Sequence, residues 1–224
     1  MPQEVRKKCA WREPAIDTIT RELGGDFTEE DKHPMSYLQW ILASFLALVL
    51  VLPAPGQVPN HVRNGSFENP KNTWVNTTCN YMALTAGSTT IPQWAVTSDT
   101  VNEIVWAFAP TCDGVSAAAG KYFVDLSGFG GDSPNGGVQQ IVKKLTPGQQ
   151  YSFSIAVVGT VPLVTVDGVP LALTPGTPFK RGTTLWTPET GSFTAQATAA
   201  ALIIQNPQPG AQIVFIDKVA IRAQ

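Results

Sequence analysis

The chain has 224 residues, and 14% of them are charged, with 15 Lys and Arg against 17 Asp and Glu. A typical globular chain is about 25% charged, so this one is sparsely charged and close to neutral. Residues 57–224 hold nine acidic and nine basic residues, with no basic stripe. This composition argues against nucleic acid as the main partner.

An apolar run, WILASFLALVLVL, occupies residues 40–52. It is shorter than the roughly 20 residues that span a bilayer, but it matches the core of a secretory signal peptide. Pro53 ends the run, and the small residues of 54–56 favour cleavage near residue 56. We therefore expect residues 35–56 to be a signal peptide, and the chain to be secreted or held in the cell envelope. The alternative is an uncleaved 40–52 helix that anchors the chain in the membrane, which would be its one contact with a bilayer.

The segment before this run, residues 1–34, holds six basic and eight acidic residues. A signal core normally follows a short basic segment instead. A start at Met35 rather than Met1 would leave an ordinary leader, whereas a true start at Met1 would give an anchored chain a cytoplasmic tail. The predicted organisation is a charged extension over 1–34, a leader or anchor over 35–56, and a domain over 57–224.

The remainder of the chain reads as strands. Over residues 150–158, apolar side chains alternate with small or polar ones, the period-two pattern of a strand with one face in a core. Asp167-Gly168 predicts a tight hairpin turn. No helical pattern of useful length follows residue 57, so we predict an all-β fold, a jelly-roll β-sandwich. The predicted strands are 62–67, 80–84, 93–97, 101–107, 121–126, 137–142, 150–158, 163–166, 191–196, 200–205 and 212–222.

The last predicted strand has an unusual face. Strict alternation places Ile213, Phe215, Val219 and Ile221 together, and it places Asp217 among them. A buried carboxylate needs a hydrogen-bond donor or a cation as its partner.

Two cysteines, Cys79 and Cys112, lie in the domain. An even pair in an oxidising compartment predicts one disulfide, which would contribute about 3–4 kcal/mol. Two buried free thiols are the alternative. A zinc site is not expected, because His61 is the one histidine of residues 57–224.

No catalytic motif stands out. The sequence Gly131-Asp132-Ser133 resembles the start of one esterase class, but Gly, Asp and Ser before a Pro are ordinary turn residues. The nine carboxylates of residues 57–224 could include a glycosidase pair, yet sequence alone cannot pair them. A phosphate-binding loop is absent, since the glycines near residue 130 lack the Walker spacing. We therefore do not expect an enzyme.

Aromatic side chains are the candidate ligand contacts, because flat rings can stack on sugar rings. Trp74 lies in a polar stretch, NPKNTWVNTT, and is the leading candidate. Trp94 lies in a predicted strand, where core packing is the ordinary role of a tryptophan. Tyr122 and Phe129 are further candidates.

Seven motifs occur in a fixed order along the domain: NGSFE at 64–68, IPQWAV at 91–96, FVDLSG at 123–128, GGVQQI at 136–141, LTPGQQYSF at 145–153, Trp186 with GSFTA at 191–195, and FIDKV at 215–219. Together they resemble the DUF642 family over about residues 62–222. Members of that family resemble galactose-binding-like jelly rolls and carbohydrate-binding modules. The resemblance implies a secreted, non-catalytic domain that associates with the cell wall or with a polysaccharide or glycoconjugate.

Related modules often carry a structural Ca²⁺ where the first and last strands meet. By this resemblance, Glu68 and Asp217 are the candidate oxygen ligands, a choice consistent with a hard cation. The family commonly has a second acidic residue where this chain has Lys218, a departure that weakens the case for the ion. The alternative is that Glu68 is an ordinary charge at a strand end and that backbone or side-chain donors hold Asp217.

Three functions remain open from the sequence. The first is a secreted carbohydrate-binding module. The second is a structural envelope or matrix protein that binds protein partners or itself. The third is a small glycan hydrolase, which would need two carboxylates at glycosidase spacing in one cleft.

Overall fold

The computed structural model describes residues 58–97, 103–129, 135–207 and 213–224. They belong to a compact unit, Pro55–Gln224. The predicted extension and leader, residues 1–56, lie outside the described residues, as do residues 131–133. Within the described ranges, no helix is long and apolar enough to cross a membrane.

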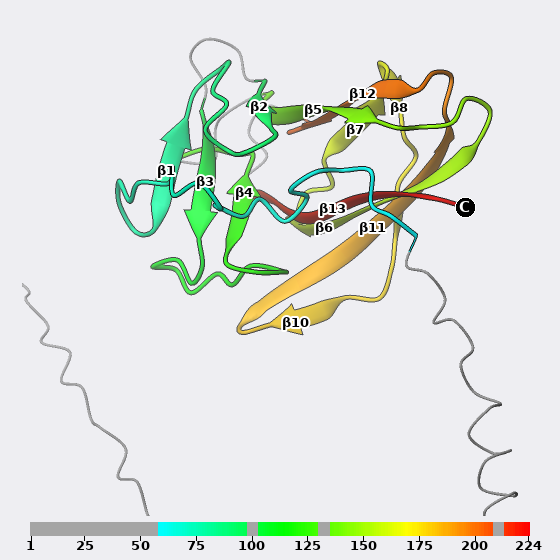
Figure 1. Cartoon of the computed structure of the whole chain (residues 1–224). Coiled ribbons are helices and arrows are strands. Elements are labelled where there is room, and N and C mark those ends of the chain that lie inside the picture. Colours follow the sequence, from blue (N-terminus) through cyan, green and yellow to red (C-terminus); the bar gives the residue numbers. More distant parts are fainter. Residues whose placement is uncertain (1–57, 98–102, 130–134, 208–212) are drawn as a thin grey trace, which may run out of the picture. The chain divides into compact units, whose positions relative to one another are not determined.

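The described chain forms two antiparallel sheets (Figure 1). The larger sheet runs in the order β1 (Tyr81–Leu84), β3 (Ile104–Phe108), β4 (Tyr122–Asp125), β13 (Val214–Ala223), β6 (Gln150–Gly159), β11 (Thr184–Thr194) and β10 (Phe179–Arg181), with β9 (Thr174–Pro175) paired to β11. The smaller sheet runs in the order β2 (Ala95–Val96), β5 (Gly137–Lys143), β12 (Ala199–Gln205), β7 (Leu163–Val166) and β8 (Val169–Pro170).

Consecutive strands alternate between the two sheets. The chain passes from β4 to β5, β6 and β7 by changing sheet at each step, and it does so again from β11 to β12 and β13. Strands that are far apart in sequence therefore become neighbours, as β13 does between β4 and β6 (Figure 1). This alternation is that of a jelly-roll sandwich, and the predicted all-β fold is confirmed.

The main core lies between the inner faces of the sheets. The alternation predicted along β6 is confirmed, because one face of this strand packs in that core through Tyr151, Phe153, Ile155 and Val157. A second apolar cluster covers the outer face of the larger sheet, where Trp186 and Phe123 pack with Ala156, Ala117 and Ala118. The outer face of an antiparallel sheet is often exposed to solvent. Here part of that face is covered by this second cluster.

The hairpin turn at Asp167-Gly168 is confirmed. These residues join β7 to β8 and have φ values of 50° and 77°. Two positive φ values are what a two-residue turn between twisted strands requires. The Asp167 carboxylate also accepts a hydrogen bond from the backbone N–H of Ala201 at 2.7 Å.

The prediction of a strand over residues 62–67 is wrong, because these residues form turns. Asn64 has a φ of 49°, and its side-chain oxygen accepts a hydrogen bond from the Glu68 N–H at 2.8 Å. Such side-chain to backbone bonds compete with a sheet ladder. Gly65 also lies hard against β13, where a Cβ atom would be 1.9 Å from the Val219 carbonyl oxygen.

The sequence predicted a strand over 191–196. It did not predict β10 or the part of β11 that precedes residue 191. Pro188 lies inside β11, and a proline normally argues against a strand interior because it cannot donate to the ladder. The Gly182-Thr183 turn adds a second break in the pattern. The short strands β8 and β9 are exposed, so they carry no hydrophobic alternation.

The face predicted for the last strand is also wrong. The register of β13 shifts between Asp217 and Ala220, so a bulge adds one residue there. Before the bulge Val214 and Ile216 enter the core, and after it Val219 and Ile221 do. Asp217 instead lies opposite Ala156, on the outer face of the larger sheet. A one-residue insertion exchanges the two faces of a strand, which strict alternation could not anticipate.

Candidate ligand-binding site

A cavity of about 470 Å³ opens on the outer face of the larger sheet. Three cross-strand neighbours, Val105, Asp125 and Phe215, lie side by side across β3, β4 and β13. Directly opposed residues of antiparallel strands point to the same face. All three line the cavity, so its floor places a carboxylate between two apolar side chains.

The walls of this cavity bring in a phenol and a second carboxylate. The Tyr81 hydroxyl donates a hydrogen bond to Asp113 Oδ2 at 3.1 Å. The Phe129 ring packs edge-on against the Tyr81 ring, with centroids 6.0 Å apart, and Phe129 remains 38% exposed. An accessible aromatic ring therefore borders the two carboxylates.

Asp125 is a half-buried acid with a raised pKa. Burial raises the pKa of Asp125 to about 6, although hydrogen bonds from Ser127 oppose the shift. The Ser127 N–H at 2.8 Å and the Ser127 hydroxyl both donate to Asp125 Oδ1. Asp125 Oδ2 accepts no hydrogen bond from the described residues, so one oxygen is free to accept from a ligand.

Tyr81 remains a neutral donor at physiological pH. Burial, together with the hydrogen bond and the charge of Asp113, raises the pKa of Tyr81 to about 12. The cavity therefore combines apolar surface and one aromatic face with hydrogen-bond acceptors. Small-molecule sites commonly have this composition, with a few placed polar groups in apolar walls and volumes of about 300–1,000 Å³.

Of the four aromatic residues predicted to bind ligand, Phe129 is the one at this cavity. Tyr122 lies on the opposite face of β4 from Asp125, since they are three residues apart. Trp74 packs on that same far side, with its ring centroid 6.1 Å from that of Tyr122. The Trp74 Nε1–H also donates to the Trp106 carbonyl at 3.0 Å, so this half-buried side chain covers the core.

Trp94 is a core residue. Only 2% of it is exposed, and its Nε1–H donates to the Asn64 carbonyl at 2.9 Å. Its ring packs against Phe67 with centroids 5.2 Å apart. Trp94 therefore packs as a core residue of the described domain, and a ligand contact by its ring stays a prediction.

Sequence reasoning missed three residues of the cavity, Tyr81, Asp113 and Asp125, as ligand contacts. Tyr81 lies in a predicted strand, and Asp125 lies in the FVDLSG motif, but neither pattern shows which residues meet across strands. Asp113 follows Cys112 directly, so the predicted pairing of Cys79 with Cys112 was the available signal that the segments of Tyr81 and Asp113 adjoin.

The two cysteines lie close in sequence to two residues that line this cavity, Tyr81 and Asp113. Cys79 and Cys112 are exposed free thiols, not the buried ones of the alternative interpretation. The Cys112 N–H donates to the Cys79 carbonyl at 3.3 Å, and a hydrogen bond with the Cys79 thiol raises the pKa of Cys112. The two side chains are therefore adjacent, and the disulfide between them stays a prediction.

Glu68 and Asp217, the predicted metal ligands, converge on one loop. Glu68 Oε1 accepts hydrogen bonds from the N–H groups of Lys121 at 2.9 Å and Tyr122 at 3.2 Å. Asp217 is fully buried, and its Oδ2 accepts from the Ala119 N–H at 2.8 Å. Burial raises the pKa of Asp217 to about 8, and the charge of Glu68 adds to the shift.

The charge of the half-buried Glu68 beside the fully buried Asp217 suits a cation. Ca²⁺ takes six to eight oxygen ligands, mostly carboxylates, carbonyls and waters. Glu68 and Asp217 could supply two of these ligands, and in the described part of the chain no third His, Cys, Asp or Glu joins them. The Lys218 ammonium lies 5.0 Å from the centre of the Phe179 ring.

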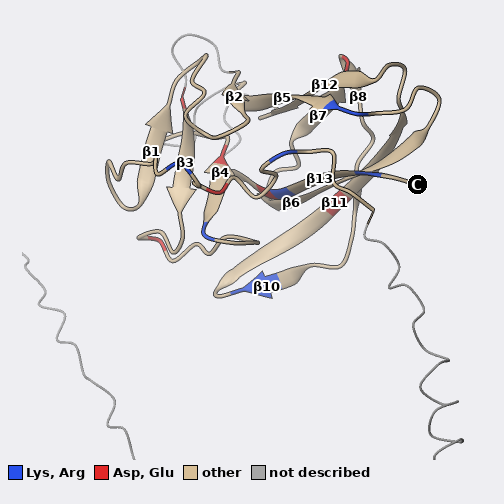
Figure 2. Ribbon diagram, in the orientation of Figure 1, with Lys and Arg blue, Asp and Glu red and all other residues tan. Residues whose placement is uncertain are grey.

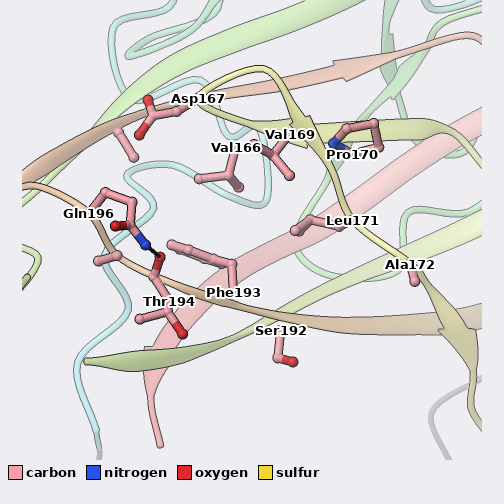
Figure 3. Close-up of a pocket in the computed structure, with 12 residues that line it drawn as sticks. Val166, Asp167, Val169, Pro170, Leu171, Ala172, Ser192, Phe193, Thr194 and Gln196 are labelled. Atoms are coloured by element: carbon pink, nitrogen blue, oxygen red, sulfur yellow. Dashed lines mark hydrogen bonds between the residues drawn. The ribbon is translucent and has the colours of Figure 1, made fainter. Parts of the chain in front are cut away.

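A further cavity, of about 300 Å³, lies between the β7–β8 hairpin and the end of β11. Figure 3 shows the Phe193 ring between Val166 and Thr194. Asp167 is bound to the Ala201 N–H, and the Gln196 amide donates to the Thr194 carbonyl at 3.2 Å. This cavity is smaller than the cavity around Asp125 and brings in one carboxylate, that of Asp167, instead of two.

Comparisons with known proteins place the chain in a family. The family model described as "Protein of unknown function (DUF642)" matches residues 60–222. Halomucin from Haloquadratum walsbyi (strain DSM 16790 / HBSQ001) is 30% identical over 200 residues, covering 81% of this chain but 2% of Halomucin, so the chain spans a small part of that relative. The CBM22-1 xylan-binding domain of Paenibacillus barcinonensis Xyn10C is similar with a TM-score of 0.36 and 15% identity, over 64% of this chain and 92% of that domain. Because the family model covers most of the sequence, the chain belongs to the DUF642 family.

Proposed function

We propose that this domain binds carbohydrate without chemically changing it, in the cavity formed by Tyr81, Asp113, Asp125 and Phe129. One observation carries the proposal: the exposed Phe129 ring borders the cavity into which Asp125 presents a carboxylate oxygen that is free of hydrogen bonds from the described residues. A sugar offers both complements, since its ring has apolar C–H faces and its rim has hydroxyl donors.

The contacts follow from these groups. The C–H face of a sugar ring packs on Phe129, as apolar surface packs on any aromatic face. Sugar hydroxyls donate to Asp125 Oδ2 and to the Asp113 carboxylate, and hydrogen bonds to a charged acceptor are about twice as strong as neutral ones. The Phe215 and Val105 side chains on the floor favour a ligand with one apolar side.

We also propose that the domain works outside the cytoplasm, secreted or at the cell envelope. The apolar run at 40–52 followed by small residues supports export, and so does the low charge of the chain.

A structural Ca²⁺ is part of the proposal. Glu68 and Asp217 would hold the ion where the turn after Asn64 meets β13, and the ion would supply a positive charge beside the buried Asp217. The ion has no role in ligand contact here, because Asp217 itself is fully buried.

One observation favours a second function. Asp113 and Asp125 line the same cavity, and two carboxylates flanking a glycosidic bond are the machinery of glycosidases. In the first proposal Asp113 is held by Tyr81 and acts only as an acceptor. Release of reducing sugar from a bound polysaccharide would favour the hydrolase, and unchanged polysaccharide after prolonged incubation would favour the binding module.

The test is retention of the full-length chain on a panel of soluble and insoluble polysaccharides, with Ca²⁺ and with chelator. We expect at least one neutral polysaccharide to retain the chain, and Phe129→Ala and Asp125→Asn each to weaken that retention. Leu185→Ala is the control, because Leu185 is 53% exposed on β11 and does not line this cavity. No retention on any polysaccharide in either condition would contradict the proposal.

A further inference from the structure

We propose that a separate cavity, at the bulge of β13, binds the anionic group of an acidic sugar, a carboxylate or a sulfate. This cavity measures about 490 Å³. Its polar lining consists of Asn60, Asn64, Ser66, Ser154, Lys218 and Arg222. It shares no residue with the cavity around Asp125.

The charge of this lining has one sign. Lys218 and Arg222 are both exposed, and no Asp or Glu lines the cavity. Neither cation forms an ion pair with any described residue. The Lys218 ammonium lies over the Phe179 ring, a contact that positions a cation without neutralising its charge. Figure 2 shows that β13 carries basic positions along its course, as β10 does.

The bulge is what presents Lys218 to solvent. In a regular strand the residue after Asp217 would share the face of Val214 and Ile216 and enter the core. The register shift after Asp217 removes Lys218 from that face, at a φ of 53° that is uncommon for a side chain of this size. Bulges recur where a strand must re-aim a side chain, and strained backbone recurs at ligand sites.

The surrounding chain fixes this conformation. The Val219 N–H donates to the Gly65 carbonyl at 2.8 Å. The Asn60 side-chain amide bridges the bulge, because it donates to the Val219 carbonyl at 3.3 Å and accepts from the Ile221 N–H at 2.9 Å. The amides of Asn60 and Asn64 are thereby committed to the backbone. The bulge and its lysine are therefore rigidly placed.

The groups left for a ligand are mostly donors. The hydroxyls of Ser66 and Ser154 form no hydrogen bond with another described residue. The Arg222 guanidinium is a planar fork that matches a carboxylate or sulfate, and Lys218 adds a compact positive charge. Asp217 does not compete, because its oxygens accept from the N–H groups of Ala119 and Lys218. Two cations and two hydroxyls around one cavity suit an oxyanion, whereas the cavity around Asp125 is acidic and suits a neutral sugar.

The experiment measures binding of the full-length chain to three probes with one backbone: dextran, carboxymethyl-dextran and dextran sulfate. We expect binding to at least one charged dextran that exceeds binding to plain dextran, and that weakens with added salt. The carboxymethyl and sulfate arms show which anion the cavity takes. We expect Lys218→Gln with Arg222→Gln to lower the affinity about tenfold or more, since each removes a charge-assisted hydrogen bond.

The matched control is Lys180→Gln with Arg181→Gln. It removes the same net charge from β10, outside this cavity, and should leave the affinity nearly unchanged. An equal loss in both double variants would mean general charge attraction and would overturn the proposal, as would no preference for charged dextran. If the double variant fails to fold, Arg222→Gln alone is a milder second variant, because Arg222 lies in the regular part of β13 beyond the bulge. Phe129→Ala should not alter this binding, so the failure of either cavity is distinguishable from the failure of the other.

Discussion

Asp125 on β4 lies directly opposite Phe215 on β13. The two residues are 90 positions apart in sequence, yet they place a carboxylate and an aromatic ring side by side on the outer face of the larger sheet. This pairing exists because β13 returns to lie between β4 and β6, and it forms the floor of the proposed glycan cavity.

The pH dependence of glycan binding should report the ionisation of Asp125. Burial raises its pKa to about 6, and only the ionised carboxylate accepts hydrogen bonds through both oxygens. We therefore expect the Kd for a retained glycan to fall as the pH rises from 5 to 7.5, measured by calorimetry. In Asp125→Asn the binding should be weaker and flat over this range. An unaltered chain whose Kd does not change from pH 5 to 7.5 would remove Asp125 from the contact.

The pH dependence of stability should report Asp217. Its pKa is about 8 in the fold, against about 4 in an unfolded chain, so the folded state holds a proton that the unfolded state has lost. The stability from this group is full below about pH 4 and is lost as the pH rises to about 8. In chelator we expect the unfolding temperature to fall by several degrees from pH 5 to 8, and Asp217→Asn to remove most of that slope.

Calcium should change the same measurement in a defined direction. An ion beside Asp217 favours its ionised form, so Ca²⁺ should raise the unfolding temperature more at pH 8 than at pH 5. Mg²⁺ is the control cation, because it prefers a tighter octahedral site and keeps its waters. An equal unfolding temperature with Ca²⁺ and with chelator at pH 8 would rule out the ion at this place.

Two glycines separate crowding from backbone strain. A Cβ atom on Gly65 would lie 1.9 Å from the Val219 carbonyl oxygen, whereas one on Gly87 would meet nothing within 4 Å. Gly87 has a φ of 77°, so Gly87→Ala should cost about 1 kcal/mol from strain alone. Gly65→Ala should cost about 2 kcal/mol or more in unfolding free energy measured with urea, because the backbone of the β13 bulge must move. Similar losses for both variants would show that the bulge yields easily.

The two cysteines should form a disulfide when an external disulfide such as oxidised glutathione accepts their electrons. With the third cysteine removed by Cys9→Ser, intact mass should then fall by two hydrogens, and the unfolding free energy should rise by about 3–4 kcal/mol relative to the reduced chain. Cys112→Ser is the control, which should show neither change. Free thiols that persist after oxidation would contradict the predicted disulfide.

Trp74→Ala distinguishes the sequence-based ligand candidate from the cavity. Because Trp74 is half-buried against Phe108 and Tyr122, its loss should destabilise the fold by about 2–4 kcal/mol. Glycan retention by the fraction that stays folded should be unchanged. Phe129→Ala should show the reverse, with lost retention and little change in unfolding free energy. A stable Trp74→Ala chain that no longer binds glycan would show that Trp74 contacts the ligand and would contradict the proposed cavity.

Local patterns in the sequence were sufficient for the fold class, but not for every strand or for the site. The alternation along β6 and the Asp167-Gly168 turn act between near neighbours, so both could be predicted. The bulge at Lys218 could not, because the residues that contact it, such as Gly65, come from a distant segment. The meeting of Tyr81, Asp113 and Asp125 depends on strand order and register in the same way. Glu68 and Asp217 were placed together by family resemblance, and they do converge on one loop.

The most direct test of the central claim is a two-dimensional amide NMR titration of the full-length chain with a soluble fragment of a retained polysaccharide. Ligand contact at the proposed cavity should shift the amides of Tyr81, Asp113, Ser127 and Phe129 first. Shifts that gather instead at Val166, Phe193 and Gln196, or no shifts at a ligand concentration that saturates retention, would contradict the assignment of the glycan site.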